Sequence, residues 1–337
     1  MDTIAILGAG AWGTALAIHL TRTRSTPAIR LWARDATQAA ALGAVRENVR
    51  YLPGAALPSS IVVTANLEAA LADATLILVA TPAGALLDVV AQAQPWGAAP
   101  LFWAGKGFVA TGAAPGVGLA HRVVGAAWSA PVGVVSGPSF AEEVARGLPT
   151  AVTVAASDPN AAESVARQLR GDTFRAYVSE DITGVEVGGA VKNVLAIAAG
   201  ASDGLGFGHN ARAALITRGL AETGRFSSAL GGRRETLMGL AGLGDLVLTC
   251  TGDLSRNRRV GLALAQGRPL AAILAELGHI AEGVTAARDV RTLSGTLGVD
   301  MPICDAVYRV LYDNLPPRRA VEALLAREPG PEFQGSL

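Results

Sequence analysis

The sequence predicts an α/β protein in which an N-terminal doubly wound sheet is followed by an all-helical C-terminal domain. In the first half of the 337 residues, short β-like runs alternate with alanine-rich helical stretches, the pattern of a sheet wound with helices on both faces. Several runs are continuous Val/Ile/Leu segments, as expected of parallel strands covered on both faces. After about residue 180 the strand signals vanish and helical stretches follow one another.

Two domains are expected, because the chain is too long for one ordinary core. They cover residues 1–180 and 181–327, and residues 328–337 are predicted to be a frayed tail. The predicted strands are 3–7, 28–33, 60–64, 75–80, 100–104, 132–136, 150–155 and 174–179. The predicted helices of the second domain are 184–203, 210–230, 234–241, 256–267, 269–277, 282–297, 302–312 and 318–327.

Composition excludes several classes of protein. Half of the residues are hydrophobic and 17% are charged, so the chain can bury large cores and is not disordered. A net charge of zero argues against binding of nucleic acid. Every apolar run of membrane-spanning length is interrupted by Gly, Pro or a charged residue, so no transmembrane segment is predicted. The N-terminus lacks the basic region of a signal peptide.

Two cysteines, Cys250 and Cys304, indicate a reducing, cytoplasmic environment rather than a disulfide framework. The four histidines are scattered along the chain and show no metal-ligand spacing, so no metal site is predicted.

A glycine motif lies between the first predicted strand and the first helix. Gly8-x-Gly10-x-x-Gly13 follows "TIAIL" and opens a helix that runs toward residue 20. In a Rossmann-type domain the first glycine allows a tight turn, the second lets a pyrophosphate approach the backbone, and the third allows close packing of helix on strand. The free N–H groups of the helix would face the phosphates. A turn with incidental glycines is disfavoured by this placement.

The end of the second strand, "LWARD", bears on the choice of cofactor. An acidic residue here holds the ribose 2′-hydroxyl of NAD, whereas a nearby arginine accommodates the 2′-phosphate of NADP. The chain offers Arg34 followed by Asp35. Arg34 favours NADPH, although Asp35 leaves NADH as an alternative cofactor. Arg34 could also be a solvated surface charge without a role in binding.

Two further segments follow predicted strands. In "WAGKGF", two glycines flank Lys106, so that a substrate or cofactor could come close to its charge; the alternative is an exposed turn lysine. In "SGPSFAEEVARG", Ser139 and Glu142 have the spacing of a capping box at a helix start. Ligands bind at such helix starts, but a plain capped helix is an equal alternative.

Lys192 lies in the middle of the predicted helix 184–203. Lys106 and Lys192 are the only lysines among 28 basic residues. The helix is apolar on all faces, which indicates burial, and lysine is almost never buried without a partner. Lys192 should therefore reach a polar cavity or a carboxylate, and Gly188 and Gly189 would leave room beside it for a ligand. A lysine brought toward neutrality can act as a general acid or base, which arginine cannot. The alternative is a lysine that extends from a partly exposed face.

Two polar groups follow downstream. Asp245 comes after a glycine-rich turn, where it could cap a helix, orient Lys192 or bind a substrate hydroxyl. In "SRNRR", Asp253 or Ser255 can cap a helix whose first turn carries Arg256, Asn257 and Arg258. Such a helix start forms an anion site. A solvated basic helix start is the alternative, and it suits Arg258 and Arg259 better than Arg256.

These segments resemble the bacterial NAD(P)-dependent glycerol-3-phosphate dehydrogenases over roughly residues 3 to 325. The motifs are "GAGAWGTALA", "WAGKG", "SGPSFAEE", "GGAVKNVLAI", "GLGDLVLTC", "SRNRRVG" and "AEG". The resemblance implies reversible reduction of dihydroxyacetone phosphate to sn-glycerol 3-phosphate for phospholipid synthesis, with NADP or NAD as cofactor. It also implies a homodimer, and Lys192 as the proton acceptor in the oxidative direction. Ala11-Trp12 departs from the Ser-aromatic pair that is frequent in the family, and His209 receives no role.

The resemblance also implies the residues that contact each ligand. The substrate contacts are Lys106, Gly137, Ser139, Lys192, Asp245, Ser255, Arg256 and Asn257. The cofactor contacts, with the three glycines of the first motif, are Gly8, Gly10, Ala11, Trp12, Gly13, Arg34, Lys106, Ala141, Arg256, Ile280 and Glu282. Lys192 and Asp245 are the candidate catalytic residues.

Two other functions fit parts of the pattern. A two-domain dehydrogenase acting on a 3-hydroxy acid would have a similar build, and "SRNRR" weighs against it only if that segment binds phosphate rather than carboxylate. A non-catalytic dinucleotide sensor, with the helical half as a dimerisation surface, would need no lysine in a polar cavity. Turnover of a substrate, as opposed to binding of cofactor alone, distinguishes a dehydrogenase from such a sensor.

Overall fold

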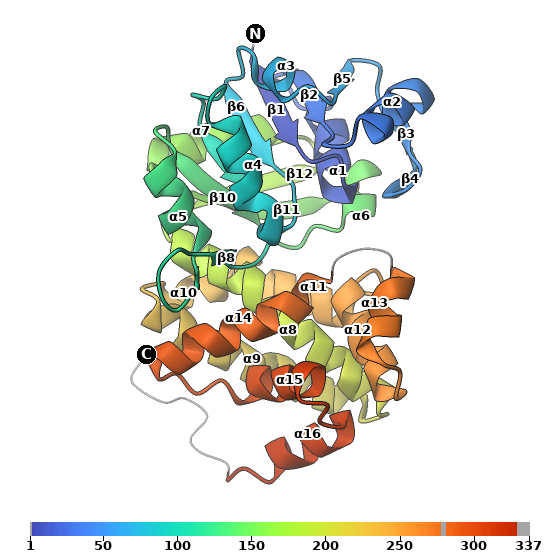
Figure 1. The fold of residues 1–337 in the computed structure, drawn as a ribbon, viewed down its shortest axis with the longest axis vertical. Coiled ribbons are helices and arrows are strands. Elements are labelled where there is room, and N and C mark those ends of the chain that lie inside the picture. Colours follow the sequence, from blue (N-terminus) through green and yellow to red (C-terminus); the bar gives the residue numbers. More distant parts are fainter. Residues whose placement is uncertain (1, 278–280, 329–337) are drawn as a thin grey trace.

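A computed structural model describes residues 2–277 and 281–328 (Figure 1). An α/β half at the top of Figure 1 carries the N-terminus, and an all-helical half lies below it. The predicted fold class is therefore confirmed. The predicted tail falls almost entirely outside the described residues.

One eight-stranded sheet forms the core of the first half, in the order β12-β11-β10-β7-β6-β1-β2-β5. All eight predicted strands belong to it, with ends that agree with the prediction or differ from it by one residue. They are β1 (Thr3–Leu7), β2 (Ala28–Trp32), β5 (Ile61–Thr64), β6 (Leu76–Val79), β7 (Leu101–Trp103), β10 (Val132–Ser136), β11 (Thr150–Ala156) and β12 (Phe174–Ser179). Two small hairpins were not predicted: β3–β4 (Glu47–Asn48, Leu52–Ala56) and β8–β9 (Val109–Ala110, Val117–Gly118).

The sheet is not parallel throughout, because β10 and β11 pair antiparallel. The chain between them forms only the short helix α6 (Ala141–Ala145), which packs beside α1 (Ala11–Leu20). It does not cross a face of the sheet as a parallel connection must, so it re-enters the sheet from the edge at which it left. β11 and β12 are again parallel to each other, through α7 (Pro159–Leu169).

Helices cover both faces of this sheet (Figure 1). Besides α1, α6 and α7, they are α2 (Ala36–Val45), α3 (Leu67–Leu71), η1 (Ala83–Ala85), α4 (Leu86–Ala93) and α5 (Ala120–Ala127). The helical half contains α8 (Ile182–Gly204), α9 (Gly208–Ala229), α10 (Arg234–Leu237), a π-helical turn η2 (Leu240–Gly244), α11 (Asp245–Thr251), α12 (Arg256–Ala265), α13 (Leu270–Leu277), α14 (Glu282–Leu297), α15 (Pro302–Tyr312) and α16 (Pro317–Leu325). Helix α11 was not predicted.

Helix α8 is the axis of the helical half. It packs against α9, α11, α12 and α14, and nearly all of its residues are buried. By length and composition it is the one helix of the described chain that could cross a membrane, yet 89% of its apolar window is buried inside the protein. Its all-round apolar sequence is therefore that of a core helix.

Polar contacts join the two halves at several points. Lys106, on the loop after β7, reaches Asp245 at the start of α11. The backbone N–H of Ala83 donates to Glu282 Oε1 at the start of α14, at 3.3 Å. The carboxyl ends of the strands consequently face the starts of helices from the other half, and the candidate residues gather at this junction.

Candidate active site

Lys192 lies buried in the middle of α8 and has a carboxylate partner. Its Nζ donates to Asp245 Oδ1 at 2.5 Å and to Thr249 Oγ1 at 2.8 Å. The side chain is 9% exposed and that of Asp245 is 1% exposed. The alternative of a lysine that extends to solvent is therefore wrong.

The surroundings of Lys192 lower its pKa to about 8. Burial is the largest cause, because it penalises the charged ammonium. The Asp245 carboxylate opposes this shift, and the nearby Lys106 ammonium adds to it. A lysine with a pKa near 8 can exchange a proton close to neutral pH.

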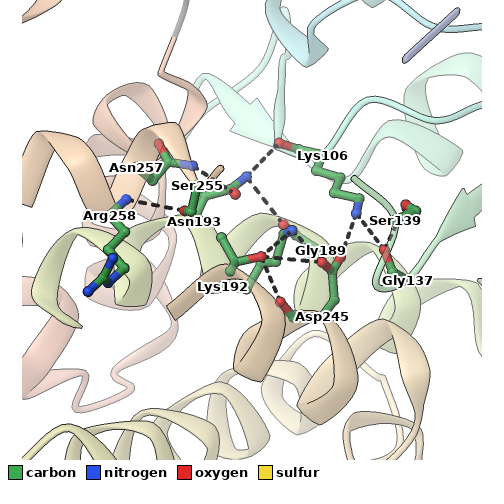
Figure 2. Close-up of polar contacts among 11 residues, drawn as sticks. Lys106, Gly137, Ser139, Gly189, Lys192, Asn193, Asp245, Ser255, Asn257 and Arg258 are labelled. Carbon is green, nitrogen blue, oxygen red and sulfur yellow. Dashed lines mark hydrogen bonds and ion pairs between the residues drawn. The ribbon is translucent and has the colours of Figure 1, made fainter. Parts of the chain in front are cut away.

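Lys106 enters the same cluster from the sheet half (Figure 2). Its Nζ donates to Asp245 Oδ2 at 2.5 Å and to the carbonyl of Gly137 at 3.0 Å. At 15% exposure, it is not the exposed turn lysine of the alternative interpretation. Each carboxylate oxygen of Asp245 thus accepts a hydrogen bond from one lysine, and the two lysines come from different halves of the molecule.

Asp245 is therefore not the cap of a helix. Helix α11 begins with this residue, and its carboxylate binds the two lysines instead of backbone N–H groups. Thr249, one turn later, also donates to the Asp245 carbonyl at 2.6 Å. The sequence analysis missed Thr249, although its i+4 spacing from Asp245 places both on one face of a helix.

A chain of amides extends the cluster toward α12 and α14 (Figure 2). Asn257 Nδ2 donates to Asn193 Oδ1 at 3.0 Å, and Asn257 Oδ1 accepts from the N–H of Gly283 at 3.0 Å. Asn193 was also missed; its place directly after Lys192 was the available signal. These bonds fix the start of α12 beside Lys192.

Ser255 caps α12 by accepting from the N–H of Arg258 at 3.2 Å. Arg258 is not solvated as expected: its guanidinium binds Asp203 at 2.8 Å and Asp253 at 3.0 Å. Arg256, in contrast, is exposed, and its guanidinium makes no ion pair or hydrogen bond with the described residues. Among the residues that the structure describes, the Arg256 guanidinium at the start of α12 is therefore unpaired.

The predicted capping box at Ser139 and Glu142 is wrong. Helix α6 starts at Ala141 with Phe140 as its cap, so Ser139 lies too early to cap it. Ser139 Oγ instead donates to the carbonyl of Gly137 at 3.0 Å, on the strand side of the turn. That carbonyl also accepts from Lys106, which brings this turn into the site.

The glycines beside Lys192 do not leave an open space. A Cβ on Gly188 would lie 2.6 Å from the carbonyl oxygen of Ala241, and one on Gly189 would lie 2.9 Å from Ser136 Oγ. They allow close packing of neighbouring segments on α8. The expectation of ligand space at these two positions is therefore wrong.

The loop between β1 and α1 has the geometry of a dinucleotide-binding turn. Gly8 has a φ of +119°, and a Cβ on Gly13 would lie 1.9 Å from the carbonyl oxygen of Gly8. A Cβ on Gly10, in contrast, would meet no described atom within 4 Å. The loop needs glycine for its turn and its packing, and Gly10 leaves the approach to the helix start open, as a pyrophosphate requires.

The other predicted cofactor residues come from several parts of the chain. Arg34 is exposed at the end of β2, and Asp35 caps α2 by accepting from the N–H of Gln38 at 2.9 Å. Ala141 opens α6, beside α1. The pKa of Glu282 is raised by burial, although Arg256 and the two lysines oppose that shift. Ile280 lies outside the described residues.

A dinucleotide loop follows the first strand of a Rossmann-type half, and a buried lysine with a pKa near 8 lies at the junction of this half with a helical half. These features define a nicotinamide-dependent oxidoreductase. Family models agree: that for the N-terminus of NAD-dependent glycerol-3-phosphate dehydrogenase matches residues 3–162, and that for its C-terminus matches residues 181–322. The chain belongs to this family, which confirms the resemblance.

Individual relatives are similar over almost the whole chain. A glycerol-3-phosphate dehydrogenase [NAD(P)+] of Aromatoleum aromaticum is 55% identical over 97% of this chain and 98% of its own. The crystal structure of glycerol-3-phosphate dehydrogenase from Coxiella burnetii is 43% identical, with a TM-score of 0.92 over 97% of this chain and 99% of that one. The Saccharomyces cerevisiae enzyme is 28% identical, with a TM-score of 0.82 over 96% and 98%.

Proposed function

We propose that the chain reduces dihydroxyacetone phosphate reversibly to sn-glycerol 3-phosphate, with Lys192 as the proton donor. The observation that carries this proposal is the buried Lys192–Asp245–Lys106 cluster, in which Lys106 comes from the sheet edge that also carries the dinucleotide loop. The loop at Gly8, Gly10 and Gly13 would hold a dinucleotide by its pyrophosphate, and its nicotinamide would supply a hydride to the carbonyl carbon. The Lys192 ammonium gives its proton to the carbonyl oxygen, so that the C=O bond becomes a C–OH group and Lys192 is left neutral.

The cluster prepares Lys192 for this step. Asp245 holds the Nζ atom at one position, while burial and the Lys106 charge weaken its hold on the proton. In the oxidative direction the neutral amine takes the hydroxyl proton from the substrate. General acid–base catalysis of this kind contributes roughly 10²–10⁴-fold to a rate.

The phosphate of the substrate binds at the start of α12. The free guanidinium of Arg256 and the N–H groups of the capped helix supply positive charge. Ser255 and Asn257 hold this helix start in place, and Lys106, Gly137 and Ser139 line the side that faces the sheet. The free cation supports phosphate rather than the carboxylate of a 3-hydroxy acid, because a phosphate dianion accepts more charge-assisted bonds.

The proposal extends to cofactor preference, the role of each domain, location and oligomeric state. NADPH is the preferred cofactor, because Arg34 is exposed at the end of β2 while Asp35 is engaged as a helix cap. Residues 1–180 form the dinucleotide-binding domain, from which Lys106, Gly137 and Ser139 also reach the substrate, and residues 181–327 form the substrate-binding and catalytic domain. The two buried free cysteines support a cytoplasmic location, and the family resemblance supports a homodimer and a role in phospholipid synthesis.

The test is the loss of NADPH absorbance, and separately of NADH absorbance, on addition of dihydroxyacetone phosphate. The wild type should oxidise both, and Lys192→Met should lose at least about 100-fold in kcat while it still binds cofactor. Folded, cofactor-binding wild type that oxidises neither cofactor would refute the substrate assignment. Hydroxy acids would be tested next, and binding without turnover of any substrate would support a sensor.

A further inference from the structure

The β3–β4 hairpin lies outside the main sheet, between α2 and β5, and the proposed chemistry gives it no role. Its first strand carries Asn48, which is 3% exposed. A buried amide is costly unless its donors and acceptors are bonded, and Asn48 is bonded at both ends. Its Oδ1 accepts from the N–H of Tyr51 at 3.3 Å, within the hairpin, and its Nδ2 faces the glycine loop.

Nδ2 of Asn48 makes two bonds to the cofactor loop and the helix after it. It donates to the carbonyl of Ala9 at 3.0 Å and to Thr14 Oγ1 at 2.7 Å. Ala9 lies between the first two glycines of the motif, and Thr14 lies in the first turn of α1. One amide therefore bridges the loop and the helix start on which the dinucleotide would rest.

A second amide meets the same carbonyl. Gln38 Nε2, on α2, donates to the Ala9 oxygen at 2.8 Å. Because a trans peptide points its N–H opposite to its C=O, two donors on the Ala9 carbonyl fix the direction of the Gly10 N–H as well. Glycine has the widest conformational freedom of any residue, so a loop with glycine on both sides of Ala9 depends on such external bonds for a single conformation.

We propose that Asn48 and Gln38 are positioning residues for the cofactor, which hold the Ala9–Gly10 peptide and the first turn of α1 in the conformation that binds a dinucleotide. Neither residue needs to touch the cofactor. Without them the loop would have to be ordered on binding, and that cost would lower the affinity for the cofactor. The proposal rests on the proposed function only in its use of turnover; binding of cofactor is measured independently.

The experiment measures the dissociation constants of NADPH and NADH by fluorescence titration, with kcat at saturating cofactor and dihydroxyacetone phosphate. Asn48→Asp keeps the acceptor for Tyr51 and removes the donor, and should raise the dissociation constants roughly tenfold or more. Gln38→Met should raise them roughly threefold, because Asn48 still holds the carbonyl. The double variant should raise the dissociation constants by more than the product of the two single-variant increases. Values of kcat should stay within about twofold, because the proton donor is untouched.

Matched controls make the same changes away from the loop. Asn66→Asp alters an exposed helix-capping asparagine of the same half, and Gln94→Met removes an equivalent amide-to-carbonyl bond to Ala127. Both should leave cofactor affinity unchanged. If Asn48→Asp does not fold, the comparison of cofactor affinity between Gln38→Met and Gln94→Met is sufficient, because Gln38→Met removes a donor from the same Ala9 carbonyl.

Two results would overturn the proposal. One is unchanged cofactor affinity in the folded variants, and the other is a loss of kcat and thermal stability with no change in affinity. Wild-type protein that binds NADPH but does not reduce dihydroxyacetone phosphate would refute the proposed function instead. The cofactor titrations of the Asn48 and Gln38 variants would still test whether these residues position the loop.

Discussion

Lys106 and Lys192, the only two lysines of the chain, bind opposite oxygens of the Asp245 carboxylate, each at 2.5 Å. One comes from the sheet half and the other from the helical half. Burial lowers the pKa of Lys192, the Asp245 carboxylate opposes that shift, and the Lys106 ammonium on the other oxygen adds to it. This arrangement predicts how the reaction depends on pH.

The pH profile should report Lys192. Reduction needs the protonated ammonium, so kcat for reduction should fall as the pH rises through about 8, whereas kcat for oxidation should rise over the same range. Lys106→Met removes a neighbour that lowers the pKa and should move the midpoint to higher pH. Asp245→Asn removes a neighbour that raises it and should move the midpoint to lower pH. Shifts in the same direction would contradict this assignment.

Arg256 should bind the substrate phosphate. Arg256→Ala should raise the KM for dihydroxyacetone phosphate by roughly 10- to 100-fold, because a charge-assisted bond to an anion is lost. Arg259→Ala, also exposed on α12, is the control and should stay within about twofold of wild type. Steady-state kinetics at saturating cofactor measure both. Equal effects of the two variants would indicate general attraction by positive charge rather than a phosphate site.

The choice of cofactor should depend on Arg34. Arg34→Ala should lower kcat/KM with NADPH roughly tenfold, because the 2′-phosphate loses its cation. Activity with NADH should remain within about twofold and serves as the internal control. Parallel assays with the two cofactors test this, and an equal loss with both would show that Arg34 does not discriminate between them.

Two glycines of one motif should respond differently to alanine. In Gly13→Ala the new Cβ would lie 1.9 Å from the Gly8 carbonyl oxygen, and such overpacking costs roughly 1–3 kcal/mol of unfolding free energy or more. In Gly10→Ala the Cβ meets no described atom within 4 Å, so the thermal midpoint should be close to that of wild type while cofactor affinity falls. Calorimetry and cofactor titration separate the two effects. A stable Gly13→Ala variant would contradict the observed packing.

Most of the fold could be predicted because its signals are local. Each buried strand is a short apolar run, and the glycine spacing before α1 is set by the backbone of the turn itself. The direction of β11 was not predictable in this way. Its reversal depends on α6 packing beside α1 instead of crossing the sheet, and that contact joins segments more than 100 residues apart.

The sequence by itself determined that Lys192 needs a buried partner, and the tertiary structure decided which residue that partner is. A lysine in an all-apolar helix must have a partner, because a buried charge is too costly alone; that inference needs no coordinates. The partner is Asp245, 53 positions away, and the amide of Asn48 reaches Ala9 over 39 positions. Hydrogen bonds act over about 3 Å, so contacts between distant segments exist only once the chain has folded, and no local pattern specifies them.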